Sequence, residues 1–247
     1  MKTIDLNCDV GEGFDSNEAL IMPLISSVNI ACGYHAGTEE SINRTIALAM
    51  QHGLTIGAHP SYNDQENFGR KPMQLADNQY FELISEQIIY LKNLVENQGG
   101  KLYHVKLHGA LYNQTAADVN LALIAAKAIY KIEPSLIFMG LAGSQHLVAA
   151  KKLGLRAISE VFSDRTYQAD GSLTPRIQPG ASLTDAEQVV KHVLGMVENQ
   201  QVISIDGKLI SVLAETICIH GDGPNAVLFA TKINEALVLK GIKIGFE

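Results

Sequence analysis

Apolar and polar residues follow two different rhythms along the chain, and the two rhythms alternate from one end to the other. Short runs rich in Val, Ile and Leu are typical of buried strands, whereas longer segments with apolar residues every three or four positions are typical of amphipathic helices. The predicted strands are Thr3 to Cys8, Ser27 to Ala31, Leu54 to Ala58, Leu102 to Lys106, Leu136 to Leu141, Leu155 to Glu160, Thr216 to Ile219 and Ile242 to Phe246. The predicted helices lie near Asn17 to Leu24, Thr38 to Gln51, Asn78 to Asn97, Asp118 to Ile132, Ser144 to Leu153, Thr184 to Asn199 and Asn225 to Lys240.

The segment from Thr184 to Asn199 has the clearest helical pattern. Thr184 and Glu187 fit a capping box at its start. Its apolar stripe consists of Val189, Val190, Val193, Leu194 and Val197. Beyond it, Asp206-Gly207 separates two alternating runs within Val202 to Val212, which predicts a β-hairpin inserted before the next strand.

Repeated strand and helix units predict parallel strands with right-handed crossovers, and seven or eight units favour closure into a (β/α) barrel. The length of 247 residues suits one such domain spanning residues 1–247. An open doubly wound sheet is the alternative. Against it, no G-x-G-x-x-G follows a predicted strand, since Gly11-Glu12-Gly13-Phe14 lacks the third glycine.

The first strand carries an unusual polar face. Asp5, Asn7 and Asp9 alternate with apolar residues, so all three point to the same side of the sheet. Burying carboxylates costs free energy unless they are paired or bind something, which makes this face a candidate site. An exposed edge strand with a hydrated face is the competing interpretation.

Composition narrows the function classes. The chain is 47% hydrophobic and 18% charged, with a net charge of -7 and no Lys/Arg cluster, which argues against nucleic acid or an anionic membrane as partner. It contains no apolar run of about 20 residues and no signal-type segment near the N-terminus, so we expect a cytoplasmic protein. Cys8, Cys32 and Cys218 lie in apolar runs, which predicts buried reduced thiols, although a nucleophilic Cys8 stays open.

Ionisable residues follow six of the predicted strands. Because the carboxyl ends of parallel barrel strands open on one rim, we expect these residues to converge on one pocket. They are Asp9, His35, His59, His108, Glu160, His220 and Asp222 as candidate catalytic residues, and Asp5, Asn7, Arg70, Lys106 and Arg165 as candidate substrate-binding residues. The other histidines, namely His52, His104, His146 and His192, lie within predicted helices or a strand and are interpreted as structural.

Residue type suggests roles. Lys106 and Arg165 can hold or polarise an oxyanion or carboxylate, whereas Asp9, Glu160 and Asp222 can act as bases or orient histidines. Histidines with an aspartate can also bind a divalent metal such as Zn²⁺, but no H-x-x-x-H or C-x-x-C spacing supports this, so metal binding stays open. No G-x-x-x-x-G-K-[ST] is present, so a loop of that type does not grip ATP in this chain.

These residues lie in segments that resemble the LamB/YcsF family, the bacterial proteins that form the A subunit of 5-oxoprolinase. The resemblance covers nearly the whole chain, except that Leu107 stands where the family motif has proline. The motifs are DLNCDVGE (Asp5 to Glu12), NIACGYHAG (Asn29 to Gly37), GAHPSY (Gly57 to Tyr62) with FGR (Phe68 to Arg70), VKLHGALYN (Val105 to Asn113), SEVFSDRTY (Ser159 to Tyr167) and ICIHGD (Ile217 to Asp222).

The resemblance implies a seven-stranded barrel similar to glycoside hydrolases and polysaccharide deacetylases. It also implies ATP-dependent opening of 5-oxo-L-proline to L-glutamate together with two partner subunits, which would handle ATP at least in part. Two alternatives remain: a self-sufficient metal-dependent deacetylase acting on a sugar amide, and a non-catalytic subunit that binds and presents the substrate.

Overall fold

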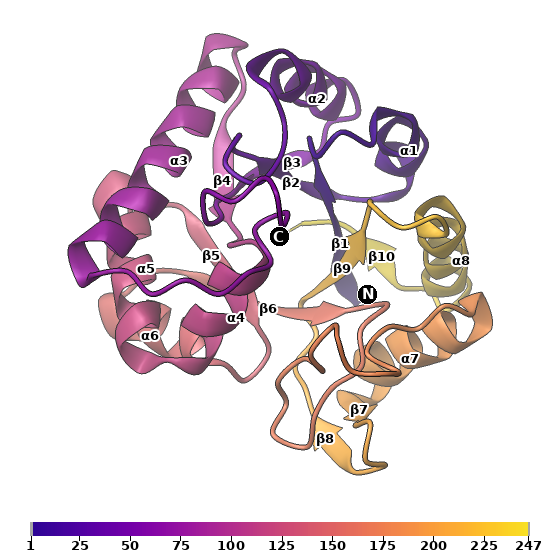
Figure 1. The fold of residues 1–247 in the computed structure, drawn as a ribbon. Coiled ribbons are helices and arrows are strands. Elements are labelled where there is room, and N and C mark those ends of the chain that lie inside the picture. The colour runs from indigo at the N-terminus through magenta and orange to yellow at the C-terminus, as the bar shows by residue number, and fades with distance from the viewer. Residues whose placement is uncertain (1, 247) are drawn as a thin grey trace.

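Seven parallel strands close into a barrel in the computed structural model, which describes residues 2–246 (Figure 1). Each strand pairs with the next, and β1 pairs with both β2 and β9, so the ring has no open edge. The strands are β1 (Thr3–Val10), β2 (Ser27–Ala31), β3 (Thr55–His59), β4 (Leu102–Val105), β5 (Ile137–Leu141), β6 (Ala157–Phe162) and β9 (Thr216–His220). The predicted barrel is therefore confirmed, and closure excludes the open doubly wound sheet.

Helices surround the barrel (Figure 1). Their apolar faces pack on the outward side chains of the strands and form the main hydrophobic core. They are α1 (Asp15–Ile21), the 3₁₀ turn η1 (Met22–Leu24), α2 (Glu39–Gln51), α3 (Asp77–Asn97), α4 (Gly109–Ala117), α5 (Val119–Ile132), α6 (Gln145–Leu153), α7 (Ala186–Asn199) and α8 (Ala226–Leu239). Helix α4 was not predicted, because its buried residues lie on several faces and leave no apolar stripe to detect.

Three local predictions have different outcomes. The hairpin is confirmed as antiparallel strands β7 (Gln201–Ile203) and β8 (Leu209–Ser211). The predicted last strand is shorter than expected, because β10 (Lys243–Ile244) pairs only with the start of β1 and lies outside the ring. The predicted capping box was wrong: Asp185 is the N-cap of α7 and accepts a hydrogen bond from the Gln188 backbone at 2.9 Å.

The two faces of β1 have different surroundings. Leu6, Cys8 and Val10 belong to the apolar core, whereas the alternate polar residues face the barrel interior, where all three are buried. This excludes an exposed edge strand. All three cysteines are buried and free, as predicted, and burial raises the pKa of the Cys8 thiol well above its ordinary value. No helix within residues 2–246 is both long and apolar enough for a bilayer crossing.

Candidate functional site

The polar face of β1 spans the depth of the barrel. Asp5 lies at the amino-terminal end, where the hydroxyl groups of Ser26, Ser27 and Thr216 donate to its carboxyl group. Burial raises the pKa of Asp5 to about 6. Asn7 lies one step higher and donates to Thr216 at 2.7 Å. Both side chains are fully enclosed by protein, which does not fit their predicted role as direct substrate contacts.

Asp9 lies at the carboxyl end of β1 and forms a buried ion pair with Lys106. Lys106 Nζ donates hydrogen bonds to Asp9 Oδ1 at 2.7 Å, to Cys218 Sγ at 2.9 Å and to Asn7 Oδ1 at 3.4 Å, and it also forms an ion pair with Glu160 Oε1 at 3.1 Å. Because an ammonium group has three N–H donors, the three hydrogen bonds occupy all of them. Lys106 therefore holds the carboxylates in place and has no spare donor for a substrate carboxylate.

Opposing effects set the charges of this pair. Burial disfavours an ionised Asp9, but His59 and Lys106 outweigh it and hold the pKa of Asp9 well below its ordinary value. Burial likewise disfavours a charged Lys106, but Asp9 outweighs it and raises the pKa of Lys106 well above its ordinary value. Both groups are therefore charged at neutral pH.

Glu160, on β6, is buried behind Lys106. Its Oε2 accepts a hydrogen bond from the Tyr112 hydroxyl at 2.7 Å, and its Oε1 accepts one from Asn7 at 3.2 Å. Burial raises the pKa of Tyr112 well above its ordinary value. Glu160 does not line the cavity itself, but it holds Lys106 and Tyr112, which do.

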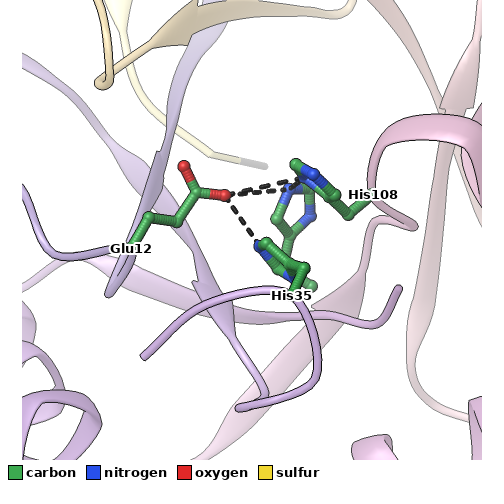
Figure 2. A group of neighbouring side chains, drawn as sticks. Glu12, His35 and His108 are labelled. Atoms are coloured by element: carbon green, nitrogen blue, oxygen red, sulfur yellow. Dashed lines mark hydrogen bonds and ion pairs between the residues drawn. The ribbon is translucent and has the colours of Figure 1, made fainter. Parts of the chain in front are cut away.

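Three of the predicted histidines meet around a glutamate at the mouth of the barrel. His35, His59 and His108 follow or end strands β2, β3 and β4, and Glu12 follows β1. Glu12 Oε1 lies 2.9 Å from His35 Nε2, 3.6 Å from His108 Nδ1 and 4.0 Å from His59 Nε2. Figure 2 shows the Glu12 carboxylate directed at the rings of His35 and His108.

Burial governs the protonation of this group. It lowers the pKa of His35 and His108 well below the ordinary value, assisted by repulsion from neighbouring histidines. Burial and the nearby Asp9 carboxylate raise the pKa of Glu12 well above its ordinary value. The neutral forms of these three side chains are thus favoured in the free protein.

His220, at the end of β9, forms a second ordered pair. Its Nδ1 lies 2.8 Å from Asp164 Oδ1, and its Nε2 lies 3.2 Å from Arg176 Nη2. Because a guanidinium group only donates, Nε2 of His220 is the acceptor and Nδ1 carries the proton given to Asp164. Burial opposes an ionised Asp164, but His220 outweighs it and lowers the pKa of Asp164. Asp164 thereby orients the His220 ring so that Nε2 is the acceptor that faces Arg176.

Arginines line the same mouth. Arg70 Nη2 pairs with Asp222 at 2.5 Å and its guanidinium lies over the Phe68 ring. Arg165 donates to the backbone carbonyls of Thr174 and Ala181, which fixes the loop after β6. Burial and the nearby Arg176 lower the pKa of Arg165 to about 10.

A cavity of about 610 Å³ joins these groups at the carboxyl ends of the strands. Of the predicted residues, Asp9, His59, Arg70, Lys106, His108, Arg165 and His220 line it. The remaining ones, Asp5, Asn7, His35, Glu160 and Asp222, are not part of its wall. The strand ends therefore do meet around one pocket, with a second layer of polar residues behind it.

Four residues of the site were not among the predicted candidates: Glu12, Tyr112, Asp164 and Arg176. Glu12 and Asp164 were visible as acidic residues just beyond strands, and that position was the available signal. Tyr112 lies on the unpredicted helix α4, and Arg176 lies in a long loop. Nothing in local sequence indicated that either would turn to the cavity.

The other histidines lie away from this cavity. His104 and His146 are fully buried, and burial lowers the pKa of each to about 3. His104 Nε2 bonds Asn29, and His146 Nε2 bonds Thr115. His192 is partly buried on α7, and His52 is exposed.

Within residues 2–246, two groups of side chains have the composition and spacing to hold a metal ion: Glu12 with His35, His59 and His108, and Asp9 with Cys218 and His220. In the second group Lys106 Nζ already contacts both Asp9 and Cys218, and its charge would repel a cation. The first group offers carboxylate and imidazole donors. Such donors suit a borderline metal such as Zn²⁺, so this donor set fits.

Fold and site together define a parallel (β/α) barrel with its functional cavity at the carboxyl-terminal mouth, the position used by barrel enzymes. The sequence profile of the LamB/YcsF family matches residues 4–246, and the chain belongs to this family. It is 48% identical over 248 residues to the A subunit of 5-oxoprolinase from Shouchella clausii, covering 99% of this chain and 98% of the relative.

Two solved structures have folds similar to this one. The lactam utilization protein from Thermus thermophilus superposes with a TM-score of 0.91 and 37% identity over 99% of both chains. A family 4 carbohydrate esterase from Streptomyces lividans superposes with a TM-score of 0.54 and 13% identity over 99% of this chain and 92% of that chain. The second likeness extends to the fold alone.

Proposed function

We propose that this chain is the lactam-binding subunit of an ATP-dependent 5-oxoprolinase, which opens 5-oxo-L-proline to L-glutamate together with two partner subunits. The observation that carries the proposal is the strand-end cavity, where an ordered base and two neighbouring arginines face the same space. Family membership and the names of the two similar proteins support the substrate class.

The chemistry explains why ATP is needed. A lactam carbonyl is a poor electrophile, and transfer of a phosphoryl group from ATP to its oxygen activates the carbon. Water then adds to that carbon, and the C–N bond breaks as the ring nitrogen gains a proton. A second water releases phosphate and leaves glutamate. The protein must therefore hold the carboxylate of the substrate and move protons to and from water and the ring nitrogen.

Arg165 and Arg176 are our candidates for binding the substrate carboxylate. Both line the cavity, and they lie close enough for Arg176 to lower the pKa of Arg165. An anion between them would relieve that repulsion and form charge-assisted hydrogen bonds. Lys106 supports the site through the carboxylates it already holds, because its donors are occupied.

His220 is our candidate for the general base. Asp164 fixes its tautomer, so its unprotonated Nε2 faces Arg176 and the cavity. Asp9 is held ionised and would stabilise positive charge as protons move. Glu160 and Asp222 would act indirectly, Glu160 through Tyr112 and Asp222 by holding Arg70.

The handling of ATP is assigned to the partners, wholly or in part. This division rests on the lack of a Walker-type loop in this sequence and on the family resemblance. We place the assembly in the cytoplasm, as the composition suggests.

The test measures glutamate release from 5-oxo-L-proline and ATP by the chain alone, by each partner alone and by the reconstituted mixture. We expect turnover in the mixture only. Full activity of the isolated chain would overturn the division of labour. Hydrolysis of an acetylated amino sugar by the chain alone, without ATP, would instead favour the deacetylase.

The binding-subunit alternative is tested with His220→Gln in the reconstituted mixture. The proposal predicts loss of turnover while binding of 5-oxo-L-proline persists. A purely substrate-presenting chain predicts the opposite: weaker binding, with turnover recovered at saturating substrate.

A further inference from the structure

Hydrogen-bond directions around the histidine cluster leave two ring nitrogens facing one another. His59 Nδ1 lies 2.7 Å from the Lys106 carbonyl, and His108 Nε2 lies 2.9 Å from the Phe68 carbonyl. A carbonyl oxygen only accepts, so both of these ring nitrogens carry a proton. In the neutral imidazoles, His59 Nε2 and His108 Nδ1 are then unprotonated, and they lie only 2.9 Å apart.

Two facing lone pairs repel each other unless a positive charge lies between or beside them. The ionised Asp9 carboxylate strengthens this demand, because its Oδ2 lies 3.3 Å from His59 Nε2. Glu12 Oε1 is within 4.0 Å of both nitrogens and adds a third donor atom beside them. A proton shared by the two rings would meet the demand at one pair of atoms. A metal ion would bind all three atoms at once, namely the two nitrogens and Glu12 Oε1.

We infer that His59 Nε2, His108 Nδ1 and Glu12 Oε1 form a binding site for one divalent transition-metal ion at the wall of the cavity. Ligands about 2.0–2.2 Å from a zinc ion lie roughly 2.8–4.2 Å from one another. The three separations here are 2.9, 3.6 and 4.0 Å. Two histidines and one carboxylate are also the ligand set of many catalytic metal sites that keep positions open.

His35 is a positioning residue in this arrangement and not a ligand. Its ring is stacked on that of His108, with centroids 3.8 Å apart and planes inclined by 7°. Imidazole binds metals in the plane of its ring, and two parallel planes share no common point for one ion. The His59 and His108 planes are inclined by 81°, so one ion can lie in both.

Each proposed ligand also has the supporting contact that metal ligands need. The two backbone carbonyls fix the tautomers of His59 and His108, and His35 Nε2 lies 2.9 Å from Glu12 Oε1 (Figure 2). Glu12, His59 and His108 line the cavity, whereas His35 does not. An ion held there would provide a Lewis acid able to polarise a carbonyl or phosphoryl oxygen.

The donor set also predicts which ions bind. Imidazole nitrogens favour Zn²⁺ and Co²⁺, whereas Mg²⁺ and Ca²⁺ prefer oxygen ligands. The test strips the full-length chain with a chelator and titrates it with Zn²⁺ by calorimetry and with Co²⁺ by visible absorption. We expect one ion per chain with micromolar or tighter affinity, and no comparable binding of Mg²⁺.

Variants locate the site. His108→Gln and Glu12→Gln should each weaken Zn²⁺ binding at least 100-fold, and His108→Gln should alter the Co²⁺ spectrum. His35→Asn should weaken binding 10- to 100-fold while keeping the stoichiometry of one. His52→Gln, which removes an exposed histidine, is the control and should bind as the unmodified chain does. Circular dichroism and urea unfolding verify that each variant is folded.

Two outcomes would overturn the inference. If the unmodified chain binds no ion, a proton occupies the space between the rings. If folded His108→Gln and Glu12→Gln bind Zn²⁺ unchanged, the ion lies elsewhere. The inference does not depend on the proposed lactam substrate, because metal binding is measured without turnover. A negative result in the 5-oxoproline assay would not contradict the metal site. Likewise, a failure to bind metal would not contradict the proposed lactam substrate.

Discussion

Lys106 Nζ and Asp9 Oδ1 lie 2.7 Å apart inside the barrel, although 97 positions separate them in sequence. Both side chains are almost completely buried. Removing one partner of a buried pair leaves the other charge without compensation, which costs far more than the loss of a surface pair. The pair thus links β1 to the residue that follows β4, and both of its side chains line the cavity.

Replacing Lys106 by Met should lower the free energy of unfolding by roughly 3–5 kcal/mol, because Asp9 and Glu160 lose their counter-ion. Urea unfolding at pH 7 measures the change. The double variant Lys106→Met with Asp9→Asn should lose less than the two single variants together. The control Lys232→Met breaks an exposed pair with Glu235 and should cost no more than about 1 kcal/mol. Equal losses at both lysines would contradict this interpretation.

Gly57→Ala should destabilise the barrel by about 1–3 kcal/mol. A Cβ at Gly57 would lie 2.1 Å from Nε2 of His104. The His104 ring cannot move aside easily, because it is fully buried and forms a hydrogen bond with Asn29. The control is Gly195→Ala in α7, where the nearest atom lies 3.5 Å away. That substitution should stabilise by about 0.5–1 kcal/mol through helix propensity. Thermal and urea unfolding of both variants compare the two, and a neutral Gly57→Ala would show that the ring is not confined.

Stability should fall as the pH drops below about 6.5, and His146 should contribute to the fall. Burial lowers the pKa of His146 to about 3, whereas an unfolded histidine titrates near 6.5. A depressed histidine pKa gives stability that is present above the unfolded value and lost as the pH falls towards the folded value. Between pH 6.5 and 5 the loss from this residue is about 2 kcal/mol.

His146→Gln should remove that part of the pH dependence while retaining a polar partner for Thr115. Urea unfolding between pH 5 and 7.5 measures the slope. His52→Gln, at an exposed position, should leave the slope as it is. An unchanged slope in His146→Gln would mean that this histidine titrates normally.

Asp164→Asn should lower kcat of the reconstituted 5-oxoprolinase by about 100-fold or more, with little change in KM. An asparagine amide can donate to Nδ1 of His220 and so place the proton on Nε2, the wrong nitrogen for a base. The pH profile of kcat should also lose its acid limb. Asp170→Asn changes an exposed aspartate on the same loop and should leave kcat intact. A full kcat in Asp164→Asn would exclude the His220 base.

Arg176→Gln should raise KM for 5-oxo-L-proline about 10- to 100-fold, because one charge-assisted hydrogen bond to the substrate carboxylate is lost. The effect on kcat should be smaller. Steady-state kinetics of the reconstituted mixture separates the two parameters. Arg44→Gln, on the exposed face of α2, is the matched control with KM unchanged. A variant whose kcat falls while KM stays constant would place Arg176 in the chemical step and not in binding.

Local patterns were sufficient to predict most of the fold. The seven barrel strands lie within two residues of their predicted bounds, because buried apolar runs and helical stripes are properties of neighbouring residues. The same is not true of α4, which is buried on several faces. Its packing comes from the barrel and not from its own periodicity.

Strand order and side-chain alternation were enough to predict that Asp9, His59, Lys106, His108 and His220 would share one mouth. They follow parallel strands, and parallel strands end on the same side. Alternation along β1 also placed Asp5 and Asn7 on the face of Asp9. These local rules could not separate residues that line the cavity from those buried behind it.

The partners of these groups depended on the tertiary structure. Closure of β1 against β9 fixes the register that buries Asp5 beside Thr216 and leaves Asp9 to face Lys106. Loops between strands and helices bring Glu12 to the histidines and Arg176 to His220. The direction of a side chain is local, but its partner depends on strand register and loop path, which arise from packing across the whole chain.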